Sequence, residues 1–277
     1  RQTQAETDEV GRAMVTYLDN AATTRIDPEV REVMLHYFDE EYGNAGSRTH
    51  IFGSAAKQAV QRAREQIATS LACEADEVIF TSGATESNNL ALLGLSSHAL
   101  DAGRRHIIST SIEHKAVLEP LQELGKRGFE VEFLKPNQGG YVAPEAVADR
   151  LRPDTILVSV MQVNNETGVE QPISEICEVL RKHSAYLHVD AAQGFGKVSG
   201  PLRNQRVDMA SISGHKINGP VGVGALMARK RDFKRPPIKP LLFGGGQQGG
   251  LRPGTLPVPL IAGLGMAAEI WERERSS

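Results

Sequence analysis

The chain has 277 residues, of which 40% are hydrophobic and 23% are charged, and its formal net charge is −3. This length can bury a full core, and the near balance of charge argues against direct nucleic-acid binding. The sequence holds no apolar run of about 18 residues, and its opening residues are polar and acidic, so we expect neither a membrane span nor a secretory signal. Its two cysteines, Cys73 and Cys177, fit neither a disulfide framework nor a metal knuckle and favour a reduced, cytoplasmic location.

The first part of the chain predicts an arm, a strand and two helices. Residues 1–14 are expected to form a disordered arm or an expression remnant. Residues 15–24 predict a short strand that leads into a small polar loop, and Pro28 predicts the start of a helix that runs to about residue 41. Apolar residues at helical spacing predict a second helix over 52–72.

Strands and helices then alternate with short connections. A glycine turn at Ser82-Gly83 joins a strand at 77–81 to a helix that reaches about residue 97. Further strands are predicted at 105–109, 130–134, 155–161, 186–190, 206–210 and 223–228, with helices at 115–127, 144–151, 173–183 and 257–274. This alternation is typical of an α/β fold with a mostly parallel sheet that helices cover on both faces.

Polar residues follow several of these strands directly. Because parallel strands bring their carboxyl ends to one edge, these residues should converge there. They are Thr85, His114, Asn165, Asp190 and Lys216.

Lys216 lies on a glycine-flanked turn after a strand, between Ser213-Gly214-His215 and Ile217. A lone lysine there is most often an ordinary surface residue, but Ser213 and His215 add donors suited to a phosphate. Asp190 adds a carboxylate at the end of another strand. A lysine that can form an imine, an acid and phosphate donors are the groups that pyridoxal phosphate (PLP) requires.

Judged by residue type alone, the other candidate site residues could also have simpler structural roles. The turn at 82–85 is also compatible with a capping box, and His114 with a helix cap or a surface residue. Residues 164–168 form a plain turn in the simpler interpretation, and the glycine-dense stretch 244–255 a flexible linker.

Seven segments together closely resemble the cysteine desulfurases of the class V aminotransferase fold, in order and spacing, from about residue 16 onward. These segments are Leu18-Asp19-Asn20-Ala21-Ala22-Thr23-Thr24, Thr81-Ser82-Gly83-Ala84-Thr85-Glu86-Ser87-Asn88, Glu113-His114-Lys115-Ala116-Val117, Val163-Asn164-Asn165-Glu166, His188-Val189-Asp190-Ala191-Ala192-Gln193, Ser213-Gly214-His215-Lys216 and Arg252-Pro253-Gly254-Thr255-Leu256-Pro257. The resemblance implies the large domain of an aspartate aminotransferase-like, PLP-dependent transferase with a seven-stranded sheet.

The resemblance also implies site roles. Lys216 would carry PLP covalently, Asp190 would pair with the ring nitrogen, and His114 would stack on the ring and move protons. The remaining expected cofactor contacts are Ala84, Thr85, Ser213 and His215 at the phosphate, Asn165 and Gln193 at the ring, and Thr255 across a homodimer interface. Asn44 would belong to a substrate-side loop, and no metal is expected.

The implied reaction removes sulfur from L-cysteine, giving L-alanine and an enzyme persulfide. Sulfur would pass to acceptor proteins of iron–sulfur cluster assembly, tRNA thiolation or DNA phosphorothioation. In the family the nucleophilic cysteine and a carboxylate-binding arginine belong to a C-terminal small domain, and neither Cys73 nor Cys177 is expected to replace that cysteine. We therefore expect a fragment that binds cofactor but does not complete sulfur transfer.

The implied domains are an N-terminal segment of the small domain (15–26), a PLP-binding large domain (27–262) and the start of the helix that leads to the C-terminal small domain (263–277). Two alternatives remain. One is a selenocysteine lyase or another enzyme on this fold. The other is a non-catalytic, PLP-binding partner subunit.

Overall fold

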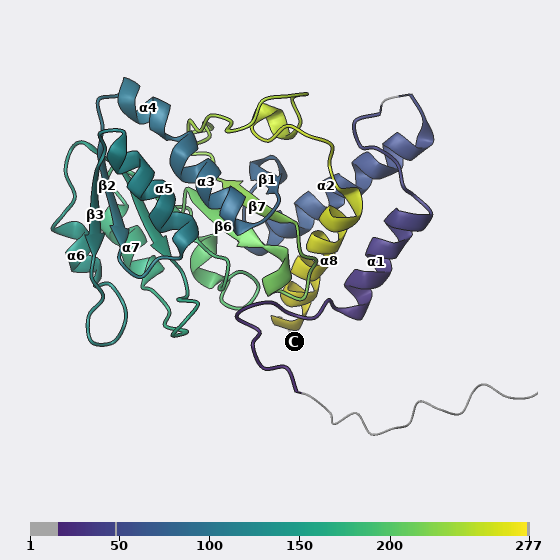
Figure 1. Cartoon of the computed structure of the whole chain (residues 1–277), viewed down its shortest axis with the longest axis horizontal. Coiled ribbons are helices and arrows are strands. Elements are labelled where there is room, and N and C mark those ends of the chain that lie inside the picture. Colours follow the sequence, from purple (N-terminus) through teal and green to yellow (C-terminus); the bar gives the residue numbers. More distant parts are fainter. Residues whose placement is uncertain (1–15, 48, 276–277) are drawn as a thin grey trace, which may run out of the picture.

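The computed structural model describes residues 16–47 and 49–275 and is built on one seven-stranded sheet (Figure 1). The strand order is β1-β7-β6-β5-β4-β2-β3. The strands are Val78–Thr81 (β1), His106–Thr110 (β2), Glu130–Leu134 (β3), Thr155–Met161 (β4), Tyr186–Asp190 (β5), Met209–Ser213 (β6) and Gly224–Ala228 (β7). Strand β7 pairs antiparallel with β1 and β6, and the other neighbours pair in parallel. The expected mostly parallel, seven-stranded α/β fold is confirmed.

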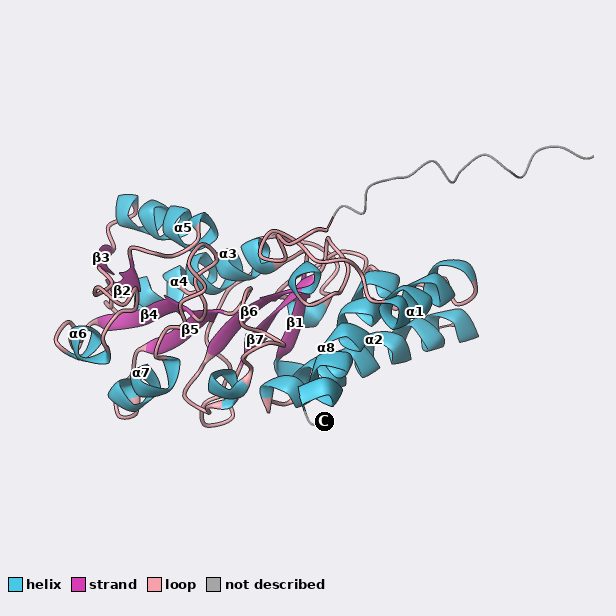
Figure 2. Ribbon diagram, turned by 90° about the horizontal axis from the view of Figure 1, so that it is seen from below, coloured by secondary structure: helices cyan, strands magenta, loops and turns pink. Residues whose placement is uncertain are grey.

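Helices cover both faces of this sheet, and as a result every residue of the interior strand β4 is buried. Figure 2 shows α3 and α5 on one face, α6 and α7 on the other, and α1, α2 and α8 grouped beside β1. The helices are Pro28–Asp39 (α1), Ile51–Leu71 (α2), Ala84–Gly94 (α3), Ser96–Asp101 (α4), Lys115–Lys126 (α5), Pro144–Ala148 (α6), Ile173–Leu180 (α7) and Val258–Arg275 (α8).

The group beside β1 depends on small residues between α2 and α8. Ala56, Ala59 and Ala63 are buried on one face of α2 at helical spacing. A Cβ added to Gly265 of α8 would lie 2.5 Å from the Cα of Ala63. The two helix backbones therefore approach closely, and α8 belongs to the same core as the sheet.

The predicted strand at 15–24 is wrong for the residues that the structure describes, since residues 16–27 contain no strand. Tyr17 and Leu18 are exposed, and the segment bonds instead to the turn that carries Lys216. The predicted arm at 1–14 lies outside the described residues. The other strands and helices are confirmed, with shifted ends in several cases; for example, α6 stops at Ala148, and the helix predicted to reach residue 97 divides into α3 and α4.

The domain division stays a prediction. Its boundary between residues 262 and 263 falls inside α8, whose buried Ile261 and Leu264 lie in one core on either side of it. Among the described residues, no helix combines the length and apolar character that crossing a bilayer requires.

A buried polar seam crosses the sheet beneath its carboxyl edge. His188 on β5 is fully buried, and its ring nitrogens bond Ser159 Oγ of β4 (2.8 Å) and Ser211 Oγ of β6 (3.0 Å). Burial lowers the pKa of His188 to about 3, so the ring is neutral at neutral pH. His188 and Asp190 alternate in phase along β5, so the seam lies on the same face of the sheet as Asp190.

We expect His188 to make folding sensitive to acid. The unfolded chain takes up the imidazole proton near pH 6.5 but the folded chain only near pH 3, so the stability of the folded state falls as the pH drops below about 6.5. Relative to wild type, His188→Gln should therefore gain about 1.4 kcal/mol in unfolding free energy between pH 7.5 and pH 5.5. Urea unfolding at both pH values measures this, with the half-exposed His98→Gln as control. Identical pH responses of His188→Gln and wild type would contradict the assignment.

Candidate active site

The carboxyl edge of the sheet holds a cavity of about 690 Å³. The structure brings together here all the predicted cofactor-contact residues except Thr255. They are Ala84, Thr85, His114, Asn165, Asp190, Gln193, Ser213, His215 and Lys216. They arrive on the connections after β1, β2, β4, β5 and β6, as expected for strand ends that share one edge.

The turn between β1 and α3 forms one end of the cavity. Gly83 has φ 154° and ψ −180°, a conformation that is open essentially to glycine alone. A Cβ on Gly224 of the neighbouring strand β7 would lie 2.6 Å from the Cα of Gly83, so position 224 also requires glycine. No described side chain caps the start of α3, which leaves the Ala84 and Thr85 N–H groups and the helix dipole available for an anion.

Asp190 lies at the end of β5 with only 5% of its surface exposed. Its Oδ1 accepts from Ala192 N (3.0 Å) and its Oδ2 accepts from Asn88 Nδ2 of α3 (2.8 Å). Burial raises the pKa of Asp190, while these two donors, His114 and Lys216 oppose the rise. The carboxylate can therefore bind a further cationic or N–H group in the cavity.

His114 is the N-cap of α5. Its Nδ1 accepts from Ala116 N (3.1 Å), which leaves Nε2 as the protonated nitrogen of the neutral ring. Asn165 donates from Nδ2 to Glu166 (2.6 Å), and Gln193 donates from Nε2 to the carbonyl of Ala21 (2.8 Å). The histidine can therefore donate a hydrogen bond from Nε2, whereas the two amides already have hydrogen-bond partners.

Lys216 ends a short turn, Gly214–Lys216, directly after β6. A Cβ on Gly214 would lie 2.8 Å from the Pro220 carbonyl oxygen, so the tight return of the chain needs glycine here. On the far side, Trp271 Nε1 of α8 donates to the carbonyl of Ile217 (3.1 Å). Burial lowers the pKa of Lys216, which favours the neutral, nucleophilic amine, although Asp19 and Asp190 oppose this shift.

Thr255 and Asn44 do not line this cavity. They line a second cavity of about 560 Å³ between α2 and the glycine-dense loop. The neighbouring Arg252 is not free to bind an anion, since its Nε donates to Glu86 Oε1 (2.8 Å). Glu86 Oε2 accepts from Ser82 N (2.7 Å), so this pair ties the loop at 244–255 to the turn at Gly83.

Both cysteines lie away from the active-site cavity and are free. Burial raises the pKa of Cys73 and of Cys177 to about 12 in each case, which disfavours the thiolate. Neither side chain is suited to be a nucleophile, in agreement with the sequence-based expectation.

The sequence matches the family profile described as Aminotransferase class-V over residues 16–276. The chain belongs to this family. A cysteine desulfurase IscS from Anaeromyxobacter dehalogenans (strain 2CP-C) is 48% identical over 261 residues, which cover 94% of this chain and 64% of that protein. The chain therefore spans less than two thirds of the length of this curated relative.

Solved structures give the same relationship. DndA from Streptomyces lividans is 59% identical with a TM-score of 0.86, over 94% of this chain and 73% of DndA. SspA, solved in complex with cysteine, is 41% identical with a TM-score of 0.85, over 92% of this chain and 72% of SspA. The resemblance to cysteine desulfurases of the class-V aminotransferase family is confirmed.

The cavity of this class-V aminotransferase family member fits PLP. One end offers N–H and hydroxyl donors at Ala84, Thr85 and Ser213 for a phosphate, and Lys216 offers an amine within the same cavity. The Oδ1 atom of Asn88 is buried and finds no hydrogen-bond partner among the described residues. These donors, amine and acid are the chemistry that the cofactor needs.

Two residues of the site were not assigned from the sequence. Asn88 donates a hydrogen bond to Asp190. The sequence signal that could have identified it is a polar residue on the same face of α3 as the buried Ala91 and Leu92. Glu113 is also buried, with its Oε1 accepting from Thr110 Oγ1 (2.7 Å) and Met161 N (2.8 Å). It thereby joins the turn that carries His114 to the end of β4.

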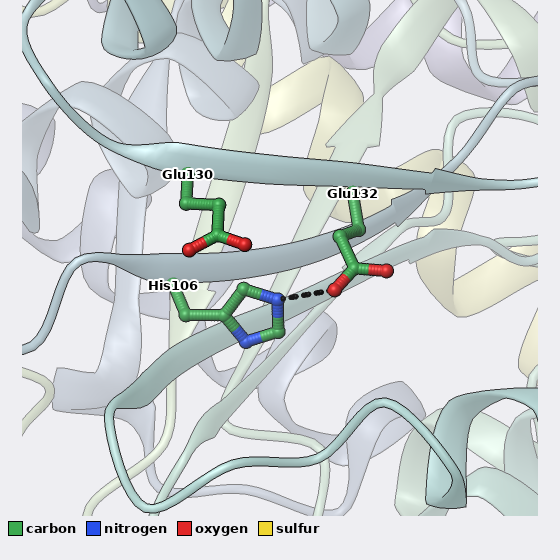
Figure 3. A group of neighbouring side chains, drawn as sticks. All are labelled: His106, Glu130 and Glu132. Carbon is green, nitrogen blue, oxygen red and sulfur yellow. Dashed lines mark hydrogen bonds and ion pairs between the residues drawn. The ribbon is translucent and has the colours of Figure 1, made fainter.

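A cluster of His106, Glu130 and Glu132 lies at the other end of the sheet, on β2 and β3 (Figure 3). His106 Nε2 bonds Glu132 Oε1 (3.2 Å), and its Nδ1 bonds Thr155 Oγ1 (2.7 Å). Arg152 bonds Glu130 and Arg150 bonds Glu132, each at 2.7 Å. Because each group already has a partner, we interpret this cluster as an ion-pair network at the sheet edge and not as a metal site.

Glu113 gives a prediction about alkaline pH. Burial raises the pKa of Glu113 to about 8, with Asp190 adding to the rise and the bonds from Thr110 and Met161 opposing it. Because the unfolded carboxyl ionises near 4.5, the stability that this proton contributes is present at low pH and is lost as the pH rises through about 8. Between pH 6 and pH 9, the wild type should lose roughly 2 to 3 kcal/mol relative to Glu113→Gln.

Urea unfolding of the wild type and Glu113→Gln at both pH values tests this. The control is Glu119→Gln, at an exposed glutamate on α5, the helix that follows Glu113, and it should follow the wild type. If Glu113→Gln also follows the wild type, Glu113 is ionised in the folded protein.

Proposed function

We propose that this chain is the PLP-binding part of a cysteine desulfurase, which converts L-cysteine to L-alanine and leaves the sulfur on an enzyme thiol. The observation that carries the proposal is the convergence of Lys216, Asp190 and an uncapped helix start on one cavity. The named relatives support the choice of reaction, since they include a cysteine desulfurase and a structure with bound cysteine.

PLP, when bound, supplies a ring that stabilises negative charge at the substrate Cα. Asp190 would hold a proton on the ring nitrogen, because a carboxylate that two donors already orient is a fixed anionic partner. Ala84, Thr85, Ser213 and His215 would hold the phosphate. Asn165 and Gln193 would exchange their present partners for the ring substituents.

Lys216 would carry the proton transfer, and His114 would support it from the same cavity. The amine of Lys216, whose pKa burial lowers, would take the proton from the substrate Cα when it is not joined to the cofactor. His114 lines the same cavity and would donate a hydrogen bond from Nε2 to the reacting groups.

We propose that the sulfur-accepting thiol comes from outside these 277 residues, because neither cysteine lines the cavity and burial disfavours both thiolates. Among the described residues that line the cavity there is no arginine, so we propose that the group that binds the substrate carboxylate also comes from elsewhere. Acceptor proteins that take up the sulfur are further proposed partners. Two free cysteines support a reducing, cytoplasmic location.

The test uses the complete gene product, in which Lys216→Ala should remove both the visible PLP band and the release of alanine and sulfide from L-cysteine under a reductant. The matched control is Lys197→Ala. Burial and the nearby Lys216 lower the pKa of this lysine too, but it does not line the cavity. A wild-type protein without a visible band, or a Lys216→Ala protein that keeps it, would overturn the proposal.

We also propose a homodimer in which Thr255 of each chain completes the phosphate site of the other. The placement of Thr255 outside its own cavity supports this, as do the exposed Leu242 and Phe243 on the same loop. Light scattering should give twice the chain mass, and Thr255→Ala should weaken PLP binding about tenfold, the effect of losing one hydrogen bond to a charged group. A monomer that binds PLP normally would contradict the assignment.

A further inference from the structure

The segment from Asp19 to Arg25, here called the strap, lies against the active-site turn. In Figure 1 it is part of the dark purple chain between the grey N-terminal trace and α1. Asp19, Ala21 and Ala22 of the strap line the cavity with Lys216. The strap has no regular secondary structure, so its position must come from specific bonds to other segments.

Thr24 supplies three of these bonds. Its backbone N–H and its hydroxyl both donate to the carbonyl of His215, each at 2.9 Å. Its Oγ1 also accepts from Asn218 N at 2.8 Å. One hydroxyl thus bonds the lysine turn on both sides of Lys216, as a donor before it and an acceptor after it.

The strap in turn holds the lysine amine. Lys216 Nζ donates to the carbonyl of Ala22 at 2.7 Å and also to that of Ala21. The Ala21 carbonyl accepts a second bond from Gln193 Nε2. Two carbonyl oxygens that converge on one amine stabilise its charged, unattached form.

We propose that Thr24 is a positioning residue for Lys216, which fixes the strap so that the carbonyls of Ala21 and Ala22 hold the lysine amine whenever it is not joined to the cofactor. This rests on the proposed function only for the role of Lys216, because the bonds themselves involve no cofactor. In the proposed reaction the Lys216 amine would be free for part of each turnover. The carbonyls of Ala21 and Ala22 would then hold it in a defined position.

Other charged groups face the amine as well. Asp19 of the strap and Asp190 of β5 raise the pKa of Lys216, against the dominant effect of burial. Burial lowers the pKa of His215 on the same turn and of Lys197, and the charge of Lys216 adds to both shifts. Without the strap carbonyls, burial would lower the pKa of Lys216 further, so the amine would be neutral more often and more reactive.

The experiment measures labelling of Lys216 in the cofactor-free protein with acetic anhydride at pH 8, read by peptide mass spectrometry. Thr24→Val removes the hydroxyl at nearly constant shape, and labelling should become about threefold to tenfold faster, as expected for an amine that loses hydrogen bonds to its charged form. Thr24→Ser keeps the hydroxyl and should label like the wild type. The exposed Lys57 is the internal control.

Fluorescence of Trp271, the single tryptophan of the chain, reports whether the variant keeps the lysine turn, because this ring bonds the carbonyl of Ile217. If Thr24→Val does not fold, Gln193→Leu replaces it. That variant removes only the amide bond to the Ala21 carbonyl and should accelerate labelling in the same direction.

A second readout uses the PLP-loaded protein. Exchange of the lysine for the amine of L-alanine should need roughly tenfold more L-alanine in Thr24→Val than in the wild type, because the released lysine has lost its acceptors. Equal labelling of Lys216 in folded Thr24→Val and in the wild type would overturn the inference even if the PLP band is normal. Faster labelling in a protein that never forms the band would leave this inference standing and remove the proposed function.

Discussion

The structure depends on one constraint, which is that the parallel strands of the sheet end at a common edge. Five of the connections that leave that edge bring polar residues into the same cavity. The buried hydrogen-bond ladders keep the strand ends in register, so the positions of Asp190 and Lys216 follow from pairing between β5 and β6. Strand β7 runs the other way, and its Gly224 lets the turn at Gly83 approach closely.

Asp190 and Glu113 are two buried carboxyl groups beside this edge, and they differ in how many of their oxygens accept hydrogen bonds. Asp190 receives one donor on each oxygen, from Asn88 and Ala192. Glu113 receives both of its donors on Oε1, and its Oε2 is buried with no partner in the part of the chain that the structure describes. A carboxylate with one unsatisfied buried oxygen is costly, so Glu113 keeps its proton at neutral pH, whereas both oxygens of Asp190 receive donors that favour its charged form.

Much of this could be predicted from the sequence, because the sheet residues are local signals. The strands β3, β4 and β5 begin and end at the predicted residues, and the site residues on the sheet edge follow directly after strands. The strand expected at 15–24 was not found among the residues described, because residues such as Leu18 have no sheet to cover and remain exposed. The location of Thr255 in a different cavity could not be predicted, since it depends on the path of an irregular loop.

The turn that carries Lys216 shows why long-range contacts escape local patterns. Trp271 near one end of the described chain bonds the carbonyl just after the lysine, while Thr24 near the other end bonds the groups on both sides of it. Neither residue is identified by periodicity, because each acts through hydrogen bonds to residues far away in the sequence. A short turn on its own fixes its backbone at a high cost in conformational entropy. The hydrogen bonds from Thr24 and Trp271 to the backbone of this turn offset that cost. As a consequence, the position of Lys216 is fixed.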